Sequence, residues 1–300
     1  MLHPFVYLAP DTLAEALALS QTCDGVRILA GGTALLVALE RGQTTAGTVI
    51  DLKRIRALRE IEVTGEGELK IGALVTMREL IASDLVSRHA PALAQTARLM
   101  ATPQVRNLGT IGGNIASGLA SADLGTIGGN IASGLASADL VTALLALDAR
   151  VVTATHKGEE RISLNDYMSR LALADPKASG IISAVIVPTD EERAAYHKLM
   201  VRQAADVPLA NVAVWIRADA ERIAAVRIAA GGCDGRPARL VEAEAALRDQ
   251  VVSAEVIGVV ARIATETAAQ TGDQRASEAY RRRMVGVLVR RALTHLLSPQ

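Results

Sequence analysis

Two glycine pairs are placed where backbone atoms could hold a charged ligand. The first lies in Ile28-Leu29-Ala30-Gly31-Gly32-Thr33-Ala34-Leu35, and the second in Gly109-Thr110-Ile111-Gly112-Gly113-Asn114. A glycine pair between a strand and a helix presents several backbone N–H groups, has no Cβ to block close approach, and adds the positive end of the helix dipole. These features suit a pyrophosphate, and the threonine in each turn adds a hydroxyl donor.

Each turn taken alone has a simpler explanation, since glycine also serves in tight turns and helix caps. Two such turns on separate strand–helix units, with no basic residue inside either motif, favour a backbone cradle for the diphosphate of a dinucleotide. The sequence contains no GxGxxG, phosphate-binding GK loop, HExxH or GxSxG motif. The signatures of Rossmann, nucleotide triphosphatase, zinc protease and serine hydrolase sites are therefore missing.

An aspartate and a lysine complete the set of candidate site residues. Asp123 and Asp139 each stand nine residues after the asparagine of a glycine motif, in Ala-Ser-Ala-Asp-Leu at the start of a helix. Such an aspartate either caps the helix or accepts a hydrogen bond from a ribose or ribityl hydroxyl, and the two roles are compatible. Lys198 lies on an expected strand, where it is either solvated or placed to stabilise a reduced flavin ring by its charge.

Sixteen residues occur twice without a difference. GTIGGNIASGLASADL spans 109–124 and again 125–140. Solenoid repeats diverge and recur at least three times, so an identical pair indicates a tandem duplication inside one element of an ancestral chain of 300 − 16 = 284 residues. The sequence does not select which copy of each motif residue is used.

Length and composition limit the kind of protein. The 300 residues favour two domains, and a 50% hydrophobic chain with 32 basic and 32 acidic residues is neither disordered nor a general nucleic-acid binder. Two cysteines, Cys23 and Cys233, cannot form a disulfide framework or hold an iron–sulfur cluster alone. No apolar run reaches the ~20 residues that span a bilayer, and Met1–Pro10 has no basic leader region. We therefore expect a cytoplasmic protein.

The elements that position these residues are predicted by periodicity and turn signals. We expect an α+β chain in which two αβ units precede a polar break at Pro188–Arg193. Beyond the break we expect a three-stranded antiparallel sheet, formed by 196–202, 210–217 and 223–230, and three helices. The expected elements before the break are helices at 12–20, 33–41, 77–82, 85–100 and 141–147 and strands at 26–30, 49–52, 61–63, 69–73, 150–155, 161–163 and 180–187.

The sequence resembles the FAD-binding medium subunits of molybdenum hydroxylases, the group of carbon monoxide dehydrogenase and bacterial xanthine dehydrogenase. The resemblance covers nearly the whole chain. It is carried by Phe5–Pro10, Ala30–Leu35, Pro103–Asn114, the Ala-Asp-Leu ending at Leu140 with Leu144–Ala149, Lys198, and Tyr280–Arg283.

The resemblance implies a fold and a set of cofactor contacts. Residues 1–188 would form an FAD-binding domain of the p-cresol methylhydroxylase type, with two αβ subdomains, and 193–300 the C-terminal domain of carbon monoxide dehydrogenase flavoproteins. The implied FAD-binding residues are Ile28, Leu29, Ala30, Gly31, Gly32, Thr33, Ala34, Leu35, Thr110, Ile111, Gly112, Gly113, Asn114, Asp123 or Asp139, Ile182 and Lys198. Of the two copies, we expect Thr110–Asn114 of the first and Asp139 of the second to be used, because they keep the family's upstream and downstream contexts.

The resemblance also implies partners. A large subunit with the molybdenum cofactor would oxidise the substrate, and a small subunit with two [2Fe–2S] clusters would pass the electrons to FAD on this chain and on to an external acceptor, in a dimer of heterotrimers. Two alternatives stay open: a free-standing FAD oxidoreductase of the same fold, and a binding module whose FAD site the duplication has impaired.

Overall fold

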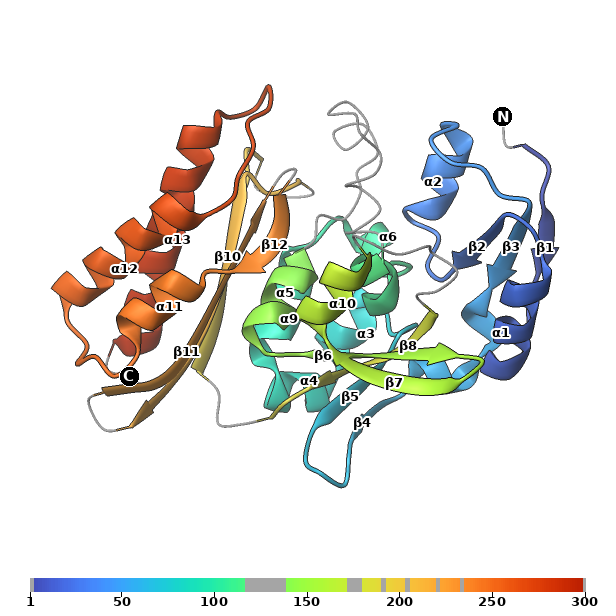
Figure 1. The fold of residues 1–300 in the computed structure, drawn as a ribbon, viewed down its shortest axis with the longest axis horizontal. Coiled ribbons are helices and arrows are strands. Elements are labelled where there is room, and N and C mark those ends of the chain that lie inside the picture. The colour runs from blue at the N-terminus through green and yellow to red at the C-terminus, as the bar shows by residue number, and fades with distance from the viewer. Residues whose placement is uncertain are drawn as a thin grey trace.

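The computed structural model describes residues 3–116, 139–171, 180–189, 193–202, 206–219, 222–232 and 235–298. Three sheets succeed one another along the molecule, with most helices packed on the second and third (Figure 1). None of the described helices combines the length and apolar character needed to cross a membrane.

The first sheet is small and parallel, in the order β1-β3-β2. Its elements are β1 (Val6–Leu8), α1 (Leu13–Thr22), β2 (Val26–Leu29), α2 (Leu35–Glu40) and β3 (Thr48–Asp51). The Thr12 side chain caps α1 by accepting from the Glu15 N–H. The sequence did not predict β1, because three residues are too few to show alternation.

The second sheet is antiparallel, in the order β4-β5-β8-β6-β7. Its strands are β4 (Ile61–Val63), β5 (Leu69–Gly72), β6 (Arg150–Thr155), β7 (Gly158–Ser163) and β8 (Ile181–Val187). Two 3-10 helices lead into it, η1 (Leu52–Arg54) and η2 (Arg56–Arg59), and its other helices are α3 (Met77–Ala82), α4 (Asp84–His89), α5 (Pro91–Leu99), α6 (Pro103–Arg106), α9 (Asp139–Ala146) and α10 (Leu164–Leu171).

One helix predicted across 85–100 is two helices in the structure, α4 and α5. The break falls at Ala90, whose backbone is not helical (φ −149°, ψ 59°). Pro91 starts α5, and the ring of a proline disfavours the helical conformation in the residue before it. The prediction relied on the apolar spacing and gave too little weight to this proline.

The third sheet has four antiparallel strands in the order β12-β11-β10-β9, where three were predicted. The elements are β9 (Arg193–Leu199), β10 (Ala210–Asp219), β11 (Arg222–Gly232), β12 (Gly235–Arg239), α11 (Val241–Leu247), α12 (Ala254–Thr267) and α13 (Glu278–Leu297). The missed strand β12 contains Pro237, which argues against a central strand but is tolerated at an edge. β12 is an edge strand, so the proline costs no essential ladder bond.

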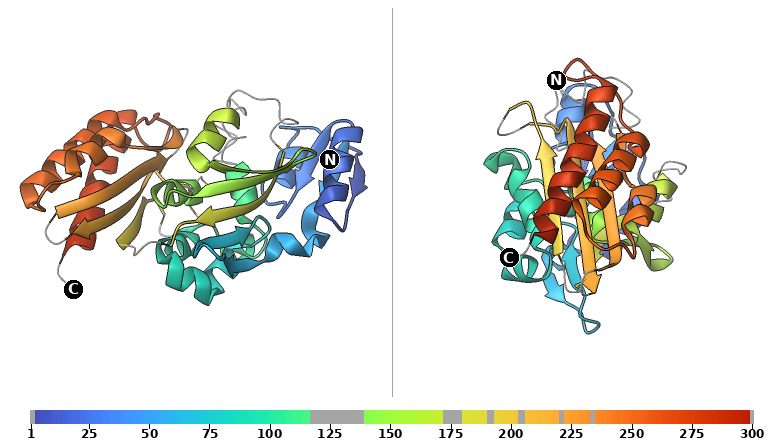
Figure 2. Two further views of the ribbon diagram at one scale, coloured as in Figure 1. Left: turned by 60° about the horizontal axis from the view of Figure 1, so that its bottom comes forward. Right: turned by 90° about the vertical axis from the view of Figure 1, so that its left-hand side faces the viewer.

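Both faces of the third sheet are buried. On β10, Val212, Val214 and Ile216 join the core beneath α11–α13, whereas Ala213 and Trp215 join the core shared with α5 and α9. Figure 2 (right) shows the orange and red helices in front of this sheet. A strand buried on both faces has a continuous apolar sequence, as in most of Leu209–Ile216. The third sheet is therefore attached to the second by a common core.

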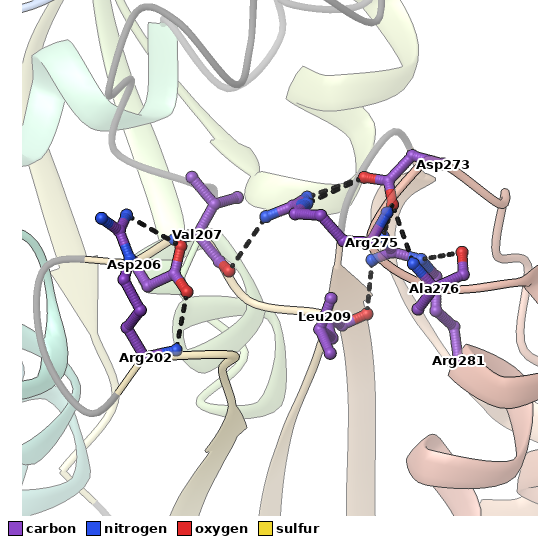
Figure 3. A network of polar contacts seen from close by, with 8 residues as sticks. All are labelled: Arg202, Asp206, Val207, Leu209, Asp273, Arg275, Ala276 and Arg281. Carbon is purple, nitrogen blue, oxygen red and sulfur yellow. Dashed lines mark hydrogen bonds and ion pairs between the residues drawn. The ribbon is translucent and has the colours of Figure 1, made fainter.

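A buried arginine ties the α12–α13 connection to the segment after β9 (Figure 3). Arg281 is fully buried and donates to Leu209 O (2.9 Å) and to Asp273 Oδ1 (2.5 Å). Arg275 donates to Asp273 Oδ2 (2.9 Å) and to Val207 O (3.4 Å). Burial would raise the pKa of Asp273, but hydrogen bonds from Arg275, Arg281 and the Ala276 N–H outweigh it and lower the pKa to about 2.

This lowered pKa predicts loss of stability in acid. Because the folded pKa lies below the ordinary 3.8, the carboxylate contributes about 2 kcal/mol above pH ~4, and this is lost as the pH falls from about 4 to about 2. Asp273→Asn should lower the urea midpoint at pH 7 and flatten its fall in acid. The control is Asp166→Asn, which alters an exposed aspartate bonded to Ser163. An unchanged acid slope in Asp273→Asn would contradict this assignment.

Candidate functional site

The first glycine turn joins β2 to α2. Gly32 has a φ of +78°, a backbone conformation that side chains rarely adopt. A Cβ on Gly31 would lie 2.0 Å from Leu108 O and 3.1 Å from Gly109 Cα. The lack of a side chain at Gly31 thus allows the second glycine segment to lie directly against the first.

The first turn presents backbone donors. Among the described residues, none accepts a hydrogen bond from the N–H groups of residues 31–35. The next N–H along the chain, that of Leu36, donates to Gly32 O. Ala34, the N-cap of α2, contributes no side-chain cap. Successive N–H groups at the start of a helix are donors of the kind that bind an anion.

The second glycine segment is different, because the N–H groups of residues 111–114 are already used. Residues 111–116 are helical. The Ile111 and Gly112 N–H groups donate to Val75 O and Ala73 O, and those of Gly113 and Asn114 donate to Thr110 Oγ1 and Thr110 O, all within 2.8–3.1 Å. The prediction that this turn also exposes bare N–H groups is wrong, because the helix packs on the 73–76 segment, whose carbonyls need donors.

Gly112 and Gly113 have separate packing roles in this segment. A Cβ on Gly112 would lie 2.7 Å from Ala73 Cβ, so Gly112 allows the helix to approach the end of β5. A Cβ on Gly113 would lie 2.9 Å from Thr110 Oγ1 and 3.9 Å from Ala30 Cβ, which places Gly113 beside the first turn. The two glycine motifs, far apart in the sequence, therefore form one surface.

Apolar side chains are exposed around this surface. Leu108 is 59% exposed, and Ile28 and Leu36 are 37% and 40% exposed. These residues flank the two glycine turns, an arrangement that suits an anion with an attached apolar or aromatic group. Ile182, by contrast, is 8% exposed and belongs to the core formed with α5 and α9.

Of the two duplicated aspartates, the structure describes Asp139, and Asp123 lies outside the described residues. Asp139 begins α9, all eight residues of which are buried. The sequences after the two aspartates differ. Val141-Thr142-Ala143-Leu144-Leu145 continues the helix that begins at Asp139, whereas Asp123-Leu124 is followed by Gly125-Thr126, a copy of Gly109-Thr110, which lie before the helix at 111–116 and not in it.

Asp139 and Lys198 lie together as a buried ion pair, Nζ to Oδ2 2.8 Å, with each side chain 1% exposed. Asp139 Oδ1 accepts from Tyr196 OH and from Asn211 Nδ2 (2.8 Å). Burial raises the pKa of Tyr196 well above 10 and the Asp139 carboxylate raises it further, so this hydroxyl stays protonated and donates. The Lys198 ammonium also donates to Leu99 O at 3.4 Å.

Sequence reasoning missed Tyr196, Asn211 and Thr142 as members of this group. Alternation on β9 would have paired Tyr196 with Lys198, since His197 between them lies on the other face with its ring 6.4 Å from that of His295. Asn211 is a single amide inside the apolar run Leu209–Ile216, and a lone buried polar group of this kind needs a partner.

No group of three or more His, Cys, Asp or Glu that could hold a metal ion occurs in the part of the chain that the structure describes. The candidate site described above consists of backbone donors, glycines that allow close approach, and exposed apolar side chains.

Comparison with known proteins gives two family matches. The family described as "FAD binding domain in molybdopterin dehydrogenase" matches residues 3–124 and 123–190, two segments that meet inside the repeat. The family described as "CO dehydrogenase flavoprotein C-terminal domain" matches residues 194–296.

Similar proteins match over nearly their whole length. The nicotine 6-hydroxylase medium subunit of Paenarthrobacter nicotinovorans is 30% identical, over 96% of this chain and 95% of the relative. The xanthine dehydrogenase FAD-binding subunit of Escherichia coli O157:H7 is 25% identical, over 97% and 96%. A solved structure of Hydrogenophaga pseudoflava carbon monoxide dehydrogenase that lacks the Mo-pyranopterin moiety has a chain with TM-score 0.86 and 29% identity, covering 98% of this chain and 97% of that one.

The repeat itself generates a prediction. Deleting 109–124 or 125–140 yields the same 284-residue sequence, and shortens the connection between Ala116 and Asp139 from 22 residues to 6. Because closing a shorter connection costs less conformational entropy, the free energy of unfolding should rise by about 1 kcal/mol. Urea unfolding of both chains measures this. A deletion chain that fails to fold would show that both copies are needed.

Proposed function

The chain belongs to the family of FAD-binding subunits of molybdopterin dehydrogenases, and from this membership we propose that it holds FAD across its two glycine motifs. It is an oxidoreductase subunit. The observation that supports this position for FAD is the contact of Gly31 with Leu108 and Gly109. Through this contact the two motifs form one continuous surface.

The residues of this surface fit an FAD diphosphate and its apolar ends. The N–H groups of Gly31–Leu35 donate to the phosphate oxygens, and Gly31 and Gly32 leave room for them. In this proposal Thr110, Ile111, Gly112, Gly113 and Asn114 line the opposite side, with Thr110 fixed by its bonds to Gly113 and Asn114. Ile28 and Leu36 cover apolar parts of the cofactor. When bound, FAD supplies a carrier that accepts and releases electrons singly or in pairs.

The proposal extends to domains and partners. Residues 1–188 form an FAD-binding domain of the p-cresol methylhydroxylase type with two αβ subdomains, and 193–300 form the second domain. A large subunit with the molybdenum cofactor and a small iron–sulfur subunit deliver electrons to this chain in the cytoplasm, within a dimer of heterotrimers, and an external acceptor removes them. The medium-subunit and FAD-subunit names of the similar proteins support this assembly.

Two glycine-to-alanine variants, Gly32→Ala and its control, test the FAD site. Gly32→Ala places a Cβ 3.1 Å from Leu36 Cδ1 and 3.3 Å from Leu29 Cδ1 at a φ of +78°, so the turn must shift. Each hydrogen bond to a phosphate oxygen that is lost costs about 1.5–3 kcal/mol, which weakens FAD binding about 10- to 150-fold. Released-flavin analysis and titration of the flavin-free chain measure this.

Gly42→Ala is the matched control. Gly42 has a φ of +67° but nothing within 4 Å of its added Cβ, so it carries the same backbone strain outside the turn. FAD affinity should stay within about twofold. Equal losses in the two variants would remove the turn from the site, and a wild-type chain that binds no FAD would support the impaired binding module.

Purification from native cells tests the partners. A tagged chain should bring down two further polypeptides, with molybdenum and about four iron atoms per FAD if two [2Fe–2S] clusters are present. A flavin-containing chain that purifies alone and still oxidises a substrate would instead favour the free-standing FAD oxidoreductase.

A further inference from the structure

An arginine joins the end of α5 to the segment that leads into the second glycine motif. Arg106 is the last residue of α6, and its guanidinium reaches back to the preceding helix. Nη1 donates to Met100 O at 2.7 Å and to Ala101 O at 2.9 Å, with a longer bond to Arg98 O at 3.4 Å. Because the last carbonyls of a helix have no partner inside it, this one side chain satisfies groups that would otherwise need another donor.

The turn that receives these bonds has an unfavourable backbone. Ala101 has a φ of +43°, in the left-handed region that residues with a side chain rarely adopt. Thr102 follows it and caps α6 by accepting from the Val105 N–H, so the helix begins two residues after the strained position. A conformation of this kind persists where surrounding contacts hold it, and the two shorter bonds of Arg106 are such contacts.

The position of α6 determines where the glycine surface lies. Val105 O accepts from the N–H groups of Leu108 (3.1 Å) and Gly109 (2.7 Å). Leu108 O is 2.0 Å from where a Cβ on Gly31 would lie, and a Cβ on Gly109 would lie 3.6 Å from Thr33 Oγ1. A shift of α6 therefore moves the backbone that lies against the first glycine turn.

We propose that Arg106 is a positioning residue for the FAD site: it fixes the turn after α5 and thereby holds the second glycine segment against Gly31. The guanidinium acts through the protein backbone and does not itself contact the diphosphate. Its role is separate from that of the N–H groups of the first turn, which bind the phosphate oxygens in the proposed function. The inference rests on that function, and one of its two measurements uses the flavin-free chain.

Arg222 supplies a matched control on the third sheet. Its Nη1 donates to Asp249 O at 2.7 Å, and Asp249, two residues after α11, has a φ of +61°. Arg222→Met thus removes an arginine bond to the carbonyl of a strained residue just after a helix, as Arg106→Met does. The first and third sheets lie at opposite ends of the molecule (Figure 1). The control therefore repeats the chemical change away from the glycine motifs.

The first measurement is hydrogen exchange of the full-length, flavin-free chain. In Arg106→Met the N–H groups of Leu108, Gly109 and Met77, the last of which donates to Gly109 O, should exchange about tenfold faster. In Arg222→Met they should stay within about twofold of the wild-type chain. Both variants should lower the thermal midpoint by about 2–4 °C. Unchanged exchange in Arg106→Met would overturn the positioning step, whether or not the chain binds flavin.

The second measurement is titration of the flavin-free chain with FAD. Arg106→Met should weaken binding about tenfold, the effect of one displaced hydrogen bond to a phosphate oxygen, and Arg222→Met should leave it within about twofold. The same titration at several NaCl concentrations separates positioning from direct charge. The dependence on salt should be equal in Arg106→Met and the wild-type chain, because the guanidinium does not face the diphosphate.

Three results of the titration would count against the proposal. A salt dependence that disappears with Arg106 would mean direct contact with the phosphates. Faster exchange with unchanged FAD affinity would limit Arg106 to a role in folding. A wild-type chain that binds no FAD would contradict the proposed function and the link from Arg106 to FAD, while the exchange result would still decide whether Arg106 positions the segment.

Arg106→Lys decides the question if Arg106→Met does not fold. Lysine keeps the charge but presents one ammonium in place of a planar guanidinium, so it does not serve the same carbonyls in the same geometry. FAD affinity should fall about threefold, half of the tenfold loss on a logarithmic scale, and the same three N–H groups should exchange faster. Wild-type affinity in Arg106→Lys would mean that the charge alone is sufficient and would overturn the proposal.

Discussion

The missing side chain at Gly31 is the constraint on which the candidate site depends. The backbone at Leu108 and Gly109 occupies the space that a Cβ would need, so the parallel sheet and the segment before the helix at 111–116 meet without any side chain between them. The same helix is held from behind by Val75 and Ala73, whose carbonyls take its first N–H groups. In the candidate site, the second glycine segment has its N–H groups bound within the protein, whereas the first turn presents N–H groups to a ligand. The two motifs have similar sequences, which do not reveal this difference.

The third sheet imposes the second constraint, because both of its faces are covered. Alternate residues of β10 enter two different cores, and the face toward α9 carries an ion pair in which both side chains are 1% exposed. Burying two charges costs several kcal/mol per ion unless each is well bonded, which the donors from Tyr196 and Asn211 provide for the carboxylate. Apolar packing alone would bring these surfaces together, whereas the hydrogen bonds to Asp139 fix which residues meet.

Local patterns predicted most of the helices and strands, and failed where a tertiary contact decides the outcome. Apolar alternation located β8 and β10, but Pro237 concealed β12, because a proline excludes a central strand and the sequence does not show which strands are at an edge. Both glycine pairs were singled out from the sequence, yet only the structure shows that the N–H groups of the second pair are used by the 73–76 segment and by Thr110. Asp139 and Lys198 were expected at one ligand, and their pairing with each other depends on a fold that brings residues 59 apart together.

The identical copies in the repeat are distinguished by what surrounds them. Gly109 is held by Met77, whose N–H donates to its carbonyl, and Thr110 forms a bridge with Thr76, so the segment entering the first copy has fixed partners. At the other end, Leu140 continues into a helix whose residues are all buried, which fixes the end of the second copy. The partners that hold these two ends, Thr76, Met77 and the part of α9 after Leu140, lie outside the repeat. A duplication inside one element can therefore leave the contacts at both ends of the repeat intact, because neither set of contacts depends on the number of residues between them.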